Sequence, residues 1–398
     1  MTLLLVIIYI VFISLGLPDS LLGAAWPVMH KDLGVDVSLA SVISMMNLVL
    51  TSFVSFFSGK YIHKYGTLKV TLVSIVCTIL GMAGIAISPN IFTIMFFSGV
   101  IGLGGGAIDT ALNSYVAKYY STRHMNWLHA FWGVGVSTSP LILSLFLKEG
   151  NWRLGYIAIS LVQSLIFAFV FWKRGQWSII KEDFSPVKED KKLSLAQILK
   201  MPGIRLSIFT AGLYSSIEFT VGTWCASYLV FSLRFHSDVA ARFVSVYFAG
   251  IMIGRILAGF VSERIKNDTL IKLGAAIALF GMLLMMFGSY YVTIAALFLL
   301  GLGYGPIYPS QLHRIPDFFG KTYAADIIGF HMAGAYAMGL LAQVSIGYIA
   351  SRTSFAIIPY MLAVLCTLLL VLNKRLLSII AKKKREKEET LAVEIQDQ

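Results

Sequence analysis

The chain has 398 residues and a formal net charge of +12, yet 57% of its residues are hydrophobic and only 13% are charged. A soluble domain carries about 25% charged residues, so this chain has too few polar side chains to cover a soluble fold of its size. The composition excludes a soluble globular protein and predicts an all-α integral membrane protein.

Apolar windows between polar residues predict twelve transmembrane helices, because about 20 apolar residues are needed to cross the hydrocarbon core of a bilayer. In chain order the windows cover residues 3–27, 39–59, 68–88, 91–117, 127–147, 153–172, 206–232, 239–261, 270–288, 290–312, 325–350 and 354–373. The first window has no basic segment before it and no A-x-A cleavage site. We therefore expect a transmembrane helix there and not a removable signal peptide.

The longest polar connection, between the sixth and seventh windows, predicts the domain organisation. We expect an N-terminal six-helix bundle at 1–173, a cytoplasmic linker at 174–204, a C-terminal six-helix bundle at 205–373 and a charged cytoplasmic tail at 374–398. Within the linker we expect a surface helix around 193–200.

The distribution of basic residues predicts the orientation. Most of the 32 Lys and Arg residues fall in segments that share one side of the membrane if both termini are cytoplasmic. By the positive-inside rule, this bias predicts a multi-pass protein of the cell membrane with both termini in the cytoplasm. The net charge thus reflects topology, and we expect contact with the lipid bilayer and no nucleic-acid partner.

The two halves of the chain contain related sequences. GLGGGAID at 102–109 aligns with GLGYGPIY at 301–308, and the same offset brings Asp19 opposite Glu218. Because six spans is an even number, both halves begin on the same side of the membrane, a plan associated with alternating-access transport. The pairs Gly102 with Gly106 and Gly301 with Gly305 have the GxxxG spacing that allows close contact between helices.

These features resemble the major facilitator superfamily, whose mark is a G-x-x-x-D-R-x-G-R loop between spans 2 and 3 that is echoed between spans 8 and 9. The first copy here reads GKYIHKYG at 59–66, with His63 where the family usually has Asp, and the second copy covers 259–264. The resemblance implies two six-helix bundles and a gating role for the loop residues. These are Gly59, Lys64, Gly66, Arg255, Gly259, Glu263 and Arg264.

Within the superfamily, the chain is similar to the fucose–galactose–glucose proton symporters. PDSLL at 18–22 matches the N-D-x-L-L-P setting of an acid in span 1 of that group, at Asp19. The segment 102–113 matches its GLG-x-x-E-T-A-x-N motif in span 4, with Asp109 in place of Glu and one extra residue. In span 5, His129 and Trp132 stand where the group has Gln and Asn. The resemblance implies proton-coupled sugar transport but does not extend to the identity of the sugar.

Three acids, Asp19, Asp109 and Glu218, lie within predicted spans. A charged side chain at the bilayer centre costs about 2.5–3.5 kcal/mol on insertion scales, so such residues face a protein interior or a wet cavity. Loss of water favours the neutral form of a carboxyl group, as binding and release of protons near working pH requires. We expect the three acids to couple transport to protons; the alternative is that each is a hydrogen-bonded packing residue.

Polar and aromatic residues occur in the same spans as the acids. Amides offer sugar hydroxyls both donors and an acceptor, while Trp and Tyr rings offer flat apolar faces with a polar handle. The residues that we expect to bind the solute are Asn47, Asn113, His129, Trp132, Tyr214, Trp224, Gln311, His331 and Gln343. The alternative is interfacial anchoring for a Trp or Tyr, and packing for a lone His.

The sequence shows no metal-ligand spacing and no nucleophile–base set, and its three cysteines lie far apart in apolar runs. We therefore expect no metal, no cofactor and no enzyme activity. GLGGGA at 102–107 imitates a dinucleotide fingerprint, but that motif must follow a strand, and here it lies inside a span. Without an ATP site, the energy for transport must come from an ion gradient or from the gradient of the solute itself.

These observations together predict a monomeric secondary active transporter that takes up a monosaccharide or a similar small polar solute with protons, by alternating access. The alternative is a proton-driven efflux antiporter for drugs or metabolites, which shares the fold and also uses acids within the membrane. Residues 133–140 lack the G-x-x-x-G-P-x-x-G-G spacing typical of antiporters, which favours uptake.

Overall fold

The structure, a computed structural model, describes residues 3–120, 122–179, 195–261, 264–320 and 324–396. In the first half the helices are α1 (Leu3–Gly16), α2 (Leu21–Asp32), α3 (Leu39–Tyr65), α4 (Thr67–Ile87), α5 (Ile91–Tyr119), α6 (Thr122–Leu147), α7 (Trp152–Trp172) and the 3₁₀ turn η1 (Arg174–Ile179). The second half has α8 (Leu195–Leu199), α9 (Ile204–Phe231), α10 (Ser237–Val261), α11 (Asn267–Met285), α12 (Tyr290–Tyr304), α13 (Ile307–His313), α14 (Ile315–Phe319), α15 (Ala324–Arg352), η2 (Phe355–Ile357) and α16 (Ile358–Gln396). These ranges contain no strand, so the predicted all-α fold class is confirmed.

Eleven helical stretches in the described residues are long and apolar enough to cross a membrane. One of them combines α1 with α2, over Leu3–Asp32, and another combines α12 to α14, over Tyr290–Phe319. The remaining predicted span is α9, which has 28 residues but carries many Ser and Thr side chains. The twelve predicted windows therefore each contain a helix, and most residues of α9 are buried inside the molecule.

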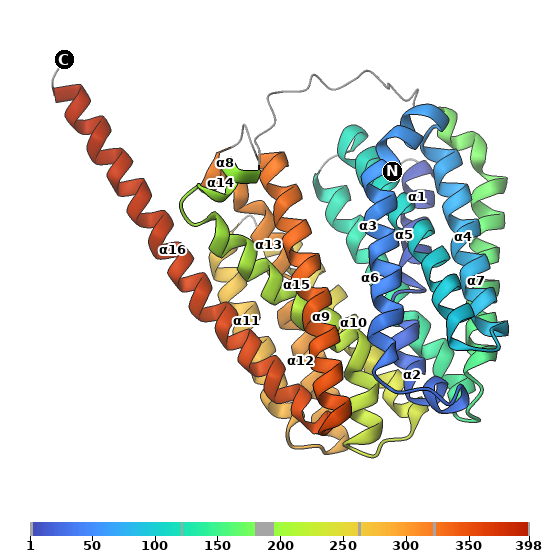
Figure 1. Cartoon of the computed structure of the whole chain (residues 1–398). Helices are drawn as coiled ribbons and strands as arrows, with labels where there is room; N and C mark the ends of the chain where they lie inside the picture. The colour runs from blue at the N-terminus through green and yellow to red at the C-terminus, as the bar shows by residue number, and fades with distance from the viewer. Residues whose placement is uncertain (1–2, 121, 180–194, 262–263, 321–323, 397–398) are drawn as a thin grey trace.

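Both chain ends lie at the same end of the molecule, together with α8 (Figure 1). We call this end the terminal end and the other the opposite end. The last helix, α16, continues without interruption to Gln396, so the predicted charged tail extends the final span as one helix. The surface helix predicted around 193–200 is present as α8, although Ile198 is buried against α9 and α14.

Helix packing repeats between the two halves of the chain. α5 packs on α3 and α4 in the first half, and α12 packs on α10 and α11 in the second. Likewise α1 pairs with α6, and α9 pairs with α15. A Cβ atom added to Gly102 would lie 2.3 Å from the carbonyl oxygen of Asn47, and one added to Gly301 would lie 2.0 Å from that of Tyr247. The GxxxG glycines thus allow close helix contact in both halves, as predicted.

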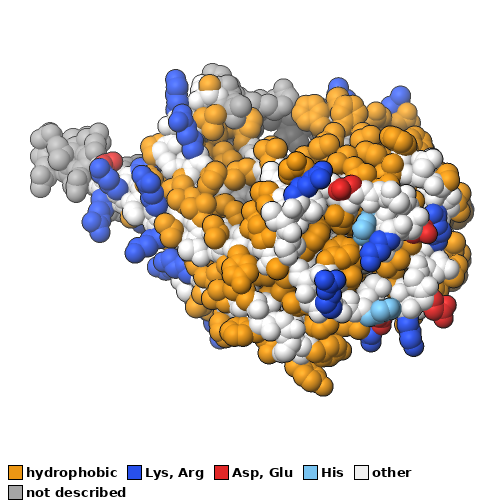
Figure 2. Space-filling view, turned by 60° about the horizontal axis from the view of Figure 1, so that its bottom comes forward, with side chains coloured by type: hydrophobic (Ala, Val, Ile, Leu, Met, Phe, Trp, Pro, Cys, Tyr) orange, Lys and Arg blue, Asp and Glu red, His pale blue; other side chains and the backbone are white. Residues whose placement is uncertain are grey.

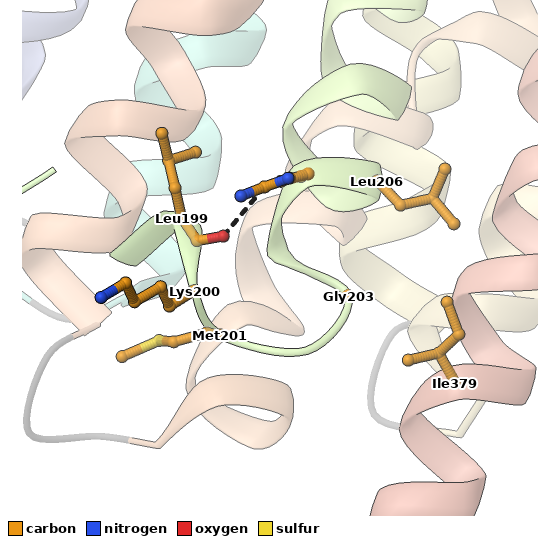
Figure 3. A pocket seen from close by; sticks show the side chains of 7 residues that line it. Leu199, Lys200, Met201, Gly203, Leu206 and Ile379 are labelled. Atoms are coloured by element: carbon orange, nitrogen blue, oxygen red, sulfur yellow. Dashed lines mark hydrogen bonds between the residues drawn. The ribbon is translucent and has the colours of Figure 1, made fainter. Parts of the chain in front are cut away.

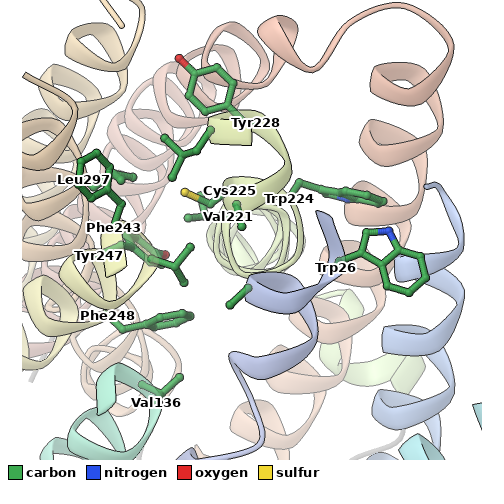
Figure 4. Close-up of a cluster of buried hydrophobic side chains, with 14 of the residues drawn as sticks. Trp26, Val136, Val221, Trp224, Cys225, Tyr228, Phe243, Tyr247, Phe248 and Leu297 are labelled. Atoms are coloured by element: carbon green, nitrogen blue, oxygen red, sulfur yellow. The ribbon is translucent and has the colours of Figure 1, made fainter. Parts of the chain in front are cut away.

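The two groups of helices meet mainly toward the opposite end. Contacts there join α6 to α10 and α2 to α9. The apolar cluster at this junction contains Trp26 of α2, Val136 of α6, Trp224 of α9 and Phe248 of α10, all buried (Figure 4). In this conformation the halves are therefore packed together at the end away from the termini.

The outer surface is the surface of a membrane protein. Orange apolar side chains cover much of the face in Figure 2, with charged side chains scattered among them. Large apolar residues on the outside of the helices are strongly exposed, among them Phe56 at 83% and Phe92 at 78%. A soluble monomer rarely exposes contiguous patches of this kind, whereas lipid covers them in a bilayer.

A pocket of about 460 Å³ lies at the terminal end, between the α8–α9 connection and α16 (Figure 3). Leu199, Leu206 and Ile379 line it, and Arg205 is held at its edge by a 3.0 Å bond from Nε to the Leu199 carbonyl. None of the acids predicted to carry protons lines this pocket.

Candidate functional site

The first predicted span is broken, and its acid lies in the break. α1 ends at Gly16 and α2 starts at Leu21, because Pro18 cannot supply the backbone N–H that continuous helix geometry needs. Asp19 is exposed there, although its neighbours Pro18 and Ser20 are buried. In discontinuous membrane helices, such breaks expose polar backbone and side-chain groups where solutes and ions bind.

Trp132 of α6 holds the carboxylate of Asp19. Its indole Nε1 donates a hydrogen bond of 2.8 Å to Oδ2 of Asp19. The close approach of α6 to α1 depends on glycines, because a Cβ atom on Gly135 would lie 2.0 Å from the carbonyl oxygen of Ile13. Two of the sequence-predicted residues, Asp19 and Trp132, are therefore in direct contact.

Arg255 connects this pair to the second half of the chain. Its guanidinium carbon lies 5.1 Å from the centre of the Trp132 ring, within the range of a cation–π contact. On its other side, Nη2 of Arg255 lies 3.7 Å from Oε1 of Glu218 on α9, and the two side chains are 13% and 19% exposed. A continuous set of contacts thus runs from Asp19 through Trp132 and Arg255 to Glu218, across the boundary between the halves.

Tyrosine rings form a wall beside Glu218. The ring of Tyr214 stacks on Tyr304, with centroids 4.2 Å apart, and on Tyr308, at 5.2 Å. The Tyr304 hydroxyl donates a hydrogen bond to the Tyr214 carbonyl. The hydroxyl of Tyr214 lies beside both Glu218 and Arg255. Tyr214 and Tyr304 are buried, and Tyr308 is half-buried, so the stack packs the Tyr214 ring among its neighbours and leaves it no free face for the solute contact that the sequence predicted.

Asp109 lies on α5 and is half-buried. Its Oδ1 accepts a 2.8 Å hydrogen bond from Nδ2 of Asn113, one turn further along the helix. The charges of Asp109 and Glu218 both act on Asp19, so the three acids share one electrostatic environment. We call Asp19, Asp109, Trp132, Glu218 and Arg255 the central cluster.

His129 of α6 is exposed and lies one turn before Trp132. The edge of its ring contacts Phe12 of α1, with centroids 5.9 Å apart, and Arg255 is close enough to act on it electrostatically. The structure therefore places His129 at the border of the central cluster, as the sequence predicted.

Five other predicted solute-binding residues are used in helix packing. Trp224 is buried, donates a 2.9 Å hydrogen bond to the Gln343 carbonyl, and covers Gly347. The Gln343 side chain accepts from Thr223 at 2.9 Å. The remaining three lie apart from the acids: Gln311 is buried and donates to the Thr210 carbonyl at 3.4 Å, His331 is fully buried in α15, and Asn47 accepts from Thr51 at 3.3 Å.

The loop-motif residues lie at the terminal end, with one exception. Gly59 and Lys64 are in the last turns of α3, and Gly66 follows with φ 82°, a left-handed conformation that favours glycine. Gly259 is near the end of α10 and Arg264 follows it, while Glu263 lies outside the described residues. The exception is Arg255, which lies about one turn before Gly259 in α10 and belongs to the central cluster.

Sequence reasoning missed two parts of this site. It assigned Arg255 to the loop motif, although a lone basic residue inside a span was already a signal for a role within the membrane. It also left out Tyr304 and Tyr308, which only the packing of α12 and α13 against α9 brings beside Tyr214. Among the described residues there is no group of three or more His, Cys, Asp or Glu side chains that could hold a metal ion.

Sequence comparisons match the chain to several known proteins, two of which are named as transporters. The chain is 26% identical over 318 residues to the cis,cis-muconate transport protein of Acinetobacter baylyi, covering 76% of each chain. It is 22% identical over 367 residues to the glucose/mannose transporter GlcP of Bacillus subtilis, covering 85% of this chain and 86% of that protein. It also matches the bypass of stop codon protein 6 of Saccharomyces cerevisiae, at 25% identity, over 64% of this chain and 56% of the yeast protein's length.

The fold is shared with a solved transporter structure. The crystal structure of the nucleoside transporter NupG superposes with a TM-score of 0.76 over 93% of this chain and 98% of that one, at 10% sequence identity. At this identity the likeness concerns the fold alone. The Major Facilitator Superfamily model matches residues 8–343 and 243–393, which together cover nearly all of the chain. This chain is therefore a multi-pass membrane transporter that belongs to the Major Facilitator Superfamily.

Proposed function

We propose that this transporter takes up a monosaccharide or a similar small polar solute together with protons, by alternating access in the cell membrane. The observation that carries the proposal is the exposed carboxylate of Asp19, in the break between α1 and α2, held by the indole of Trp132. An acid at this depth is costly to insert, so its presence indicates a role in transport. Because the Asp19 side chain is exposed, it can exchange protons with water.

The contacts around Asp19 supply a route for coupling. Trp132 bears both the hydrogen bond to Asp19 and the ring over which Arg255 lies, and Arg255 pairs with Glu218. Protonation of Asp19 removes the charge to which the Trp132 indole donates, and this weakens the hold on the ring that contacts Arg255 of the second half. We assign Asp19 as the proton carrier and Asp109, with its partner Asn113, as the acid that couples protonation to the solute.

Each step of transport then corresponds to a change in how the halves meet. In this conformation they are packed together at the opposite end, from which we infer that the solute reaches the central cluster from the terminal end. The excess of basic residues in the terminal-end segments supports the cytoplasm as the side of both termini. Solute release into the cytoplasm is the step that this conformation serves.

GlcP is a glucose/mannose transporter, and the similarity of this chain to it supports a sugar as the solute. The half-buried rings of Trp132 and Tyr308 offer the apolar faces that a pyranose needs on its C–H side. Asp109, Asn113 and His129 offer acceptors and donors for hydroxyl groups.

The test is uptake of radiolabelled monosaccharides into proteoliposomes, with an imposed pH gradient that drives protons in the direction of uptake. We expect the wild type to concentrate the solute. Asp19→Asn should abolish accumulation while retaining counterflow exchange, because Asn keeps the shape of Asp but cannot carry a proton. Asp317→Asn, which changes an exposed acid in α14, is the matched control and should behave as wild type.

Two results would contradict the proposal. Full accumulation by Asp19→Asn would exclude Asp19 as the coupling acid. Expulsion of drugs, with no accumulation of any sugar by the wild type, would replace uptake by the efflux alternative.

A further inference from the structure

Arg255 is a largely buried arginine inside a membrane-spanning helix, where a charged side chain is unfavourable. It lies in the interior of α10, and its side chain is only 13% exposed. A basic residue at this depth costs about 2.5–3.5 kcal/mol on insertion scales, so it is retained for a partner that compensates the charge. Glu218 is its ion-pair partner among the described residues, and the geometry of that pair is loose.

The pair with Glu218 and the neighbouring Tyr214 hydroxyl leave part of the binding capacity of the guanidinium unused. A charge-assisted N–H···O bond normally measures about 2.7–2.9 Å, whereas Nη2 of Arg255 lies 3.7 Å from Oε1 of Glu218. Nε of Arg255 is buried and has no hydrogen-bond partner in the described part of the chain. A guanidinium has five N–H donors in a planar fork, so this arginine can still bind a planar acceptor.

Arg314 provides a comparison within the same chain. It also leaves some guanidinium nitrogens without partners, but it donates to Asn373 at 2.6 Å and to Asp268 at 3.2 Å. Its side chain is 2% exposed, so it reaches no accessible space and ties α11, α13 and α16 together. Arg255 instead lies over Trp132, next to the exposed carboxylate of Asp19.

We infer that the transported solute carries a carboxylate group, and that Arg255 binds it. The inference rests on the proposed function, because it specifies the solute of the same site. A guanidinium fork matches a carboxylate with two parallel hydrogen bonds, a geometry that a sugar hydroxyl does not offer. The solute class that fits both this fork and the hydroxyl-binding groups at Asp109, Asn113 and His129 is a small hydroxy acid, such as a sugar acid.

The charges of the central cluster explain how such an anion depends on protons. Asp19, Asp109 and Glu218 all repel a carboxylate when they are ionised, and like charges close together in a low dielectric are strongly unfavourable. Protonation of Glu218 would free Arg255 for the solute, and protonation of Asp19 would remove a second repulsion. The anion and protons therefore bind together, which is the coupling that symport requires.

The experiment measures binding to purified protein in the absence of any gradient, with matched pairs of ligands. Isothermal titration compares D-gluconate with D-glucose, and D-galacturonate with D-galactose. We expect each acid to bind at least tenfold more tightly than its neutral partner. Arg255→Gln should weaken acid binding by roughly 30-fold or more, and Arg255→Lys should recover only part of it, since the charge returns without the fork.

The control variant is Arg242→Gln, on the same helix but in an exposed pair with Asp238 at the opposite end, and it should bind as wild type. Neutral sugars that bind as tightly as the acids would overturn the inference, as would full acid affinity in Arg255→Gln. If that variant fails to fold, the comparison of ligand pairs on the wild type decides alone. Failure of the proposed function looks different: acids bind, but a pH gradient drives no accumulation.

Discussion

A single methyl group added at Gly23 should shift the equilibrium between the conformation closed at the opposite end and the conformation open there. Gly23 in α2 and Gly222 in α9 are related by the same repeat offset as Asp19 and Glu218, and they lie against each other where the halves meet. A Cβ atom added to Gly23 would be 1.9 Å from the Gly222 carbonyl oxygen, whereas real Cβ contacts essentially never fall under 3.0 Å. Gly23→Ala therefore requires α2 and α9 to separate by about 1 Å.

The same substitution on the other side of the contact, Gly222→Ala, supplies a control. A Cβ atom added to Gly222 has Phe248 as its nearest neighbour, at 3.9 Å, which is ordinary contact. Both changes gain about 0.8–1.0 kcal/mol of helix propensity, but only Gly23→Ala bears an overpacking cost of about 1–3 kcal/mol. This cost falls on the conformation described here, in which the opposite ends are closed, and it shifts the equilibrium toward the alternative by about 5- to 150-fold.

Double electron–electron resonance measures this shift directly. Spin labels at Glu149, in the α6–α7 connection, and Thr353, after α15, report the distance between the halves at the opposite end, in a background with the three native cysteines replaced. Gly23→Ala should populate a longer distance, and Gly222→Ala should leave the distribution unchanged. Identical distributions for the two variants would refute the reasoning, because it rests on the asymmetry of that contact.

Three further outcomes follow from the contacts. Gly102→Ala should lower the melting temperature in thermal unfolding, because the added atom would lie 2.3 Å from the Asn47 carbonyl oxygen, whereas Gly105→Ala, whose nearest neighbour is at 3.8 Å, should not. Asp109→Asn should abolish pH-driven accumulation in proteoliposomes; accumulation at the wild-type level would show that this acid is not needed for coupling. Arg314→Gln should destabilise the protein by about 3 kcal/mol, because it leaves a buried hydrogen-bond network incomplete. Thermal unfolding measures this loss, and acid binding should not be selectively lost. Unchanged stability would contradict the role of Arg314 in joining α11 to α16.

Much of this architecture is determined by the sequence alone. Bilayer thickness sets the length of a membrane helix, so apolar windows reveal helices directly, and the predicted windows each contain one. The GxxxG pairs indicated close helix contacts because glycine has no side chain to hold two helix backbones apart. Asp19, Asp109 and Glu218 stood out because ionisable groups are rare within spans, and the structure places all three in one electrostatic environment.

The tertiary structure alone decided which side chains meet. In a membrane protein, lipid and interior are both apolar, so the hydrophobic pattern of a helix hardly shows which face looks inward. Trp132 and Trp224 therefore look alike in sequence, yet Trp132 bonds to Asp19 while Trp224 is buried against Gly347. Arg255 was placed with the loop motif because it precedes that motif in the chain, but its position depends on α6, α9 and α10 packing around it. Contacts between residues so far apart in sequence arise from the geometry of helix packing, which local sequence patterns do not contain.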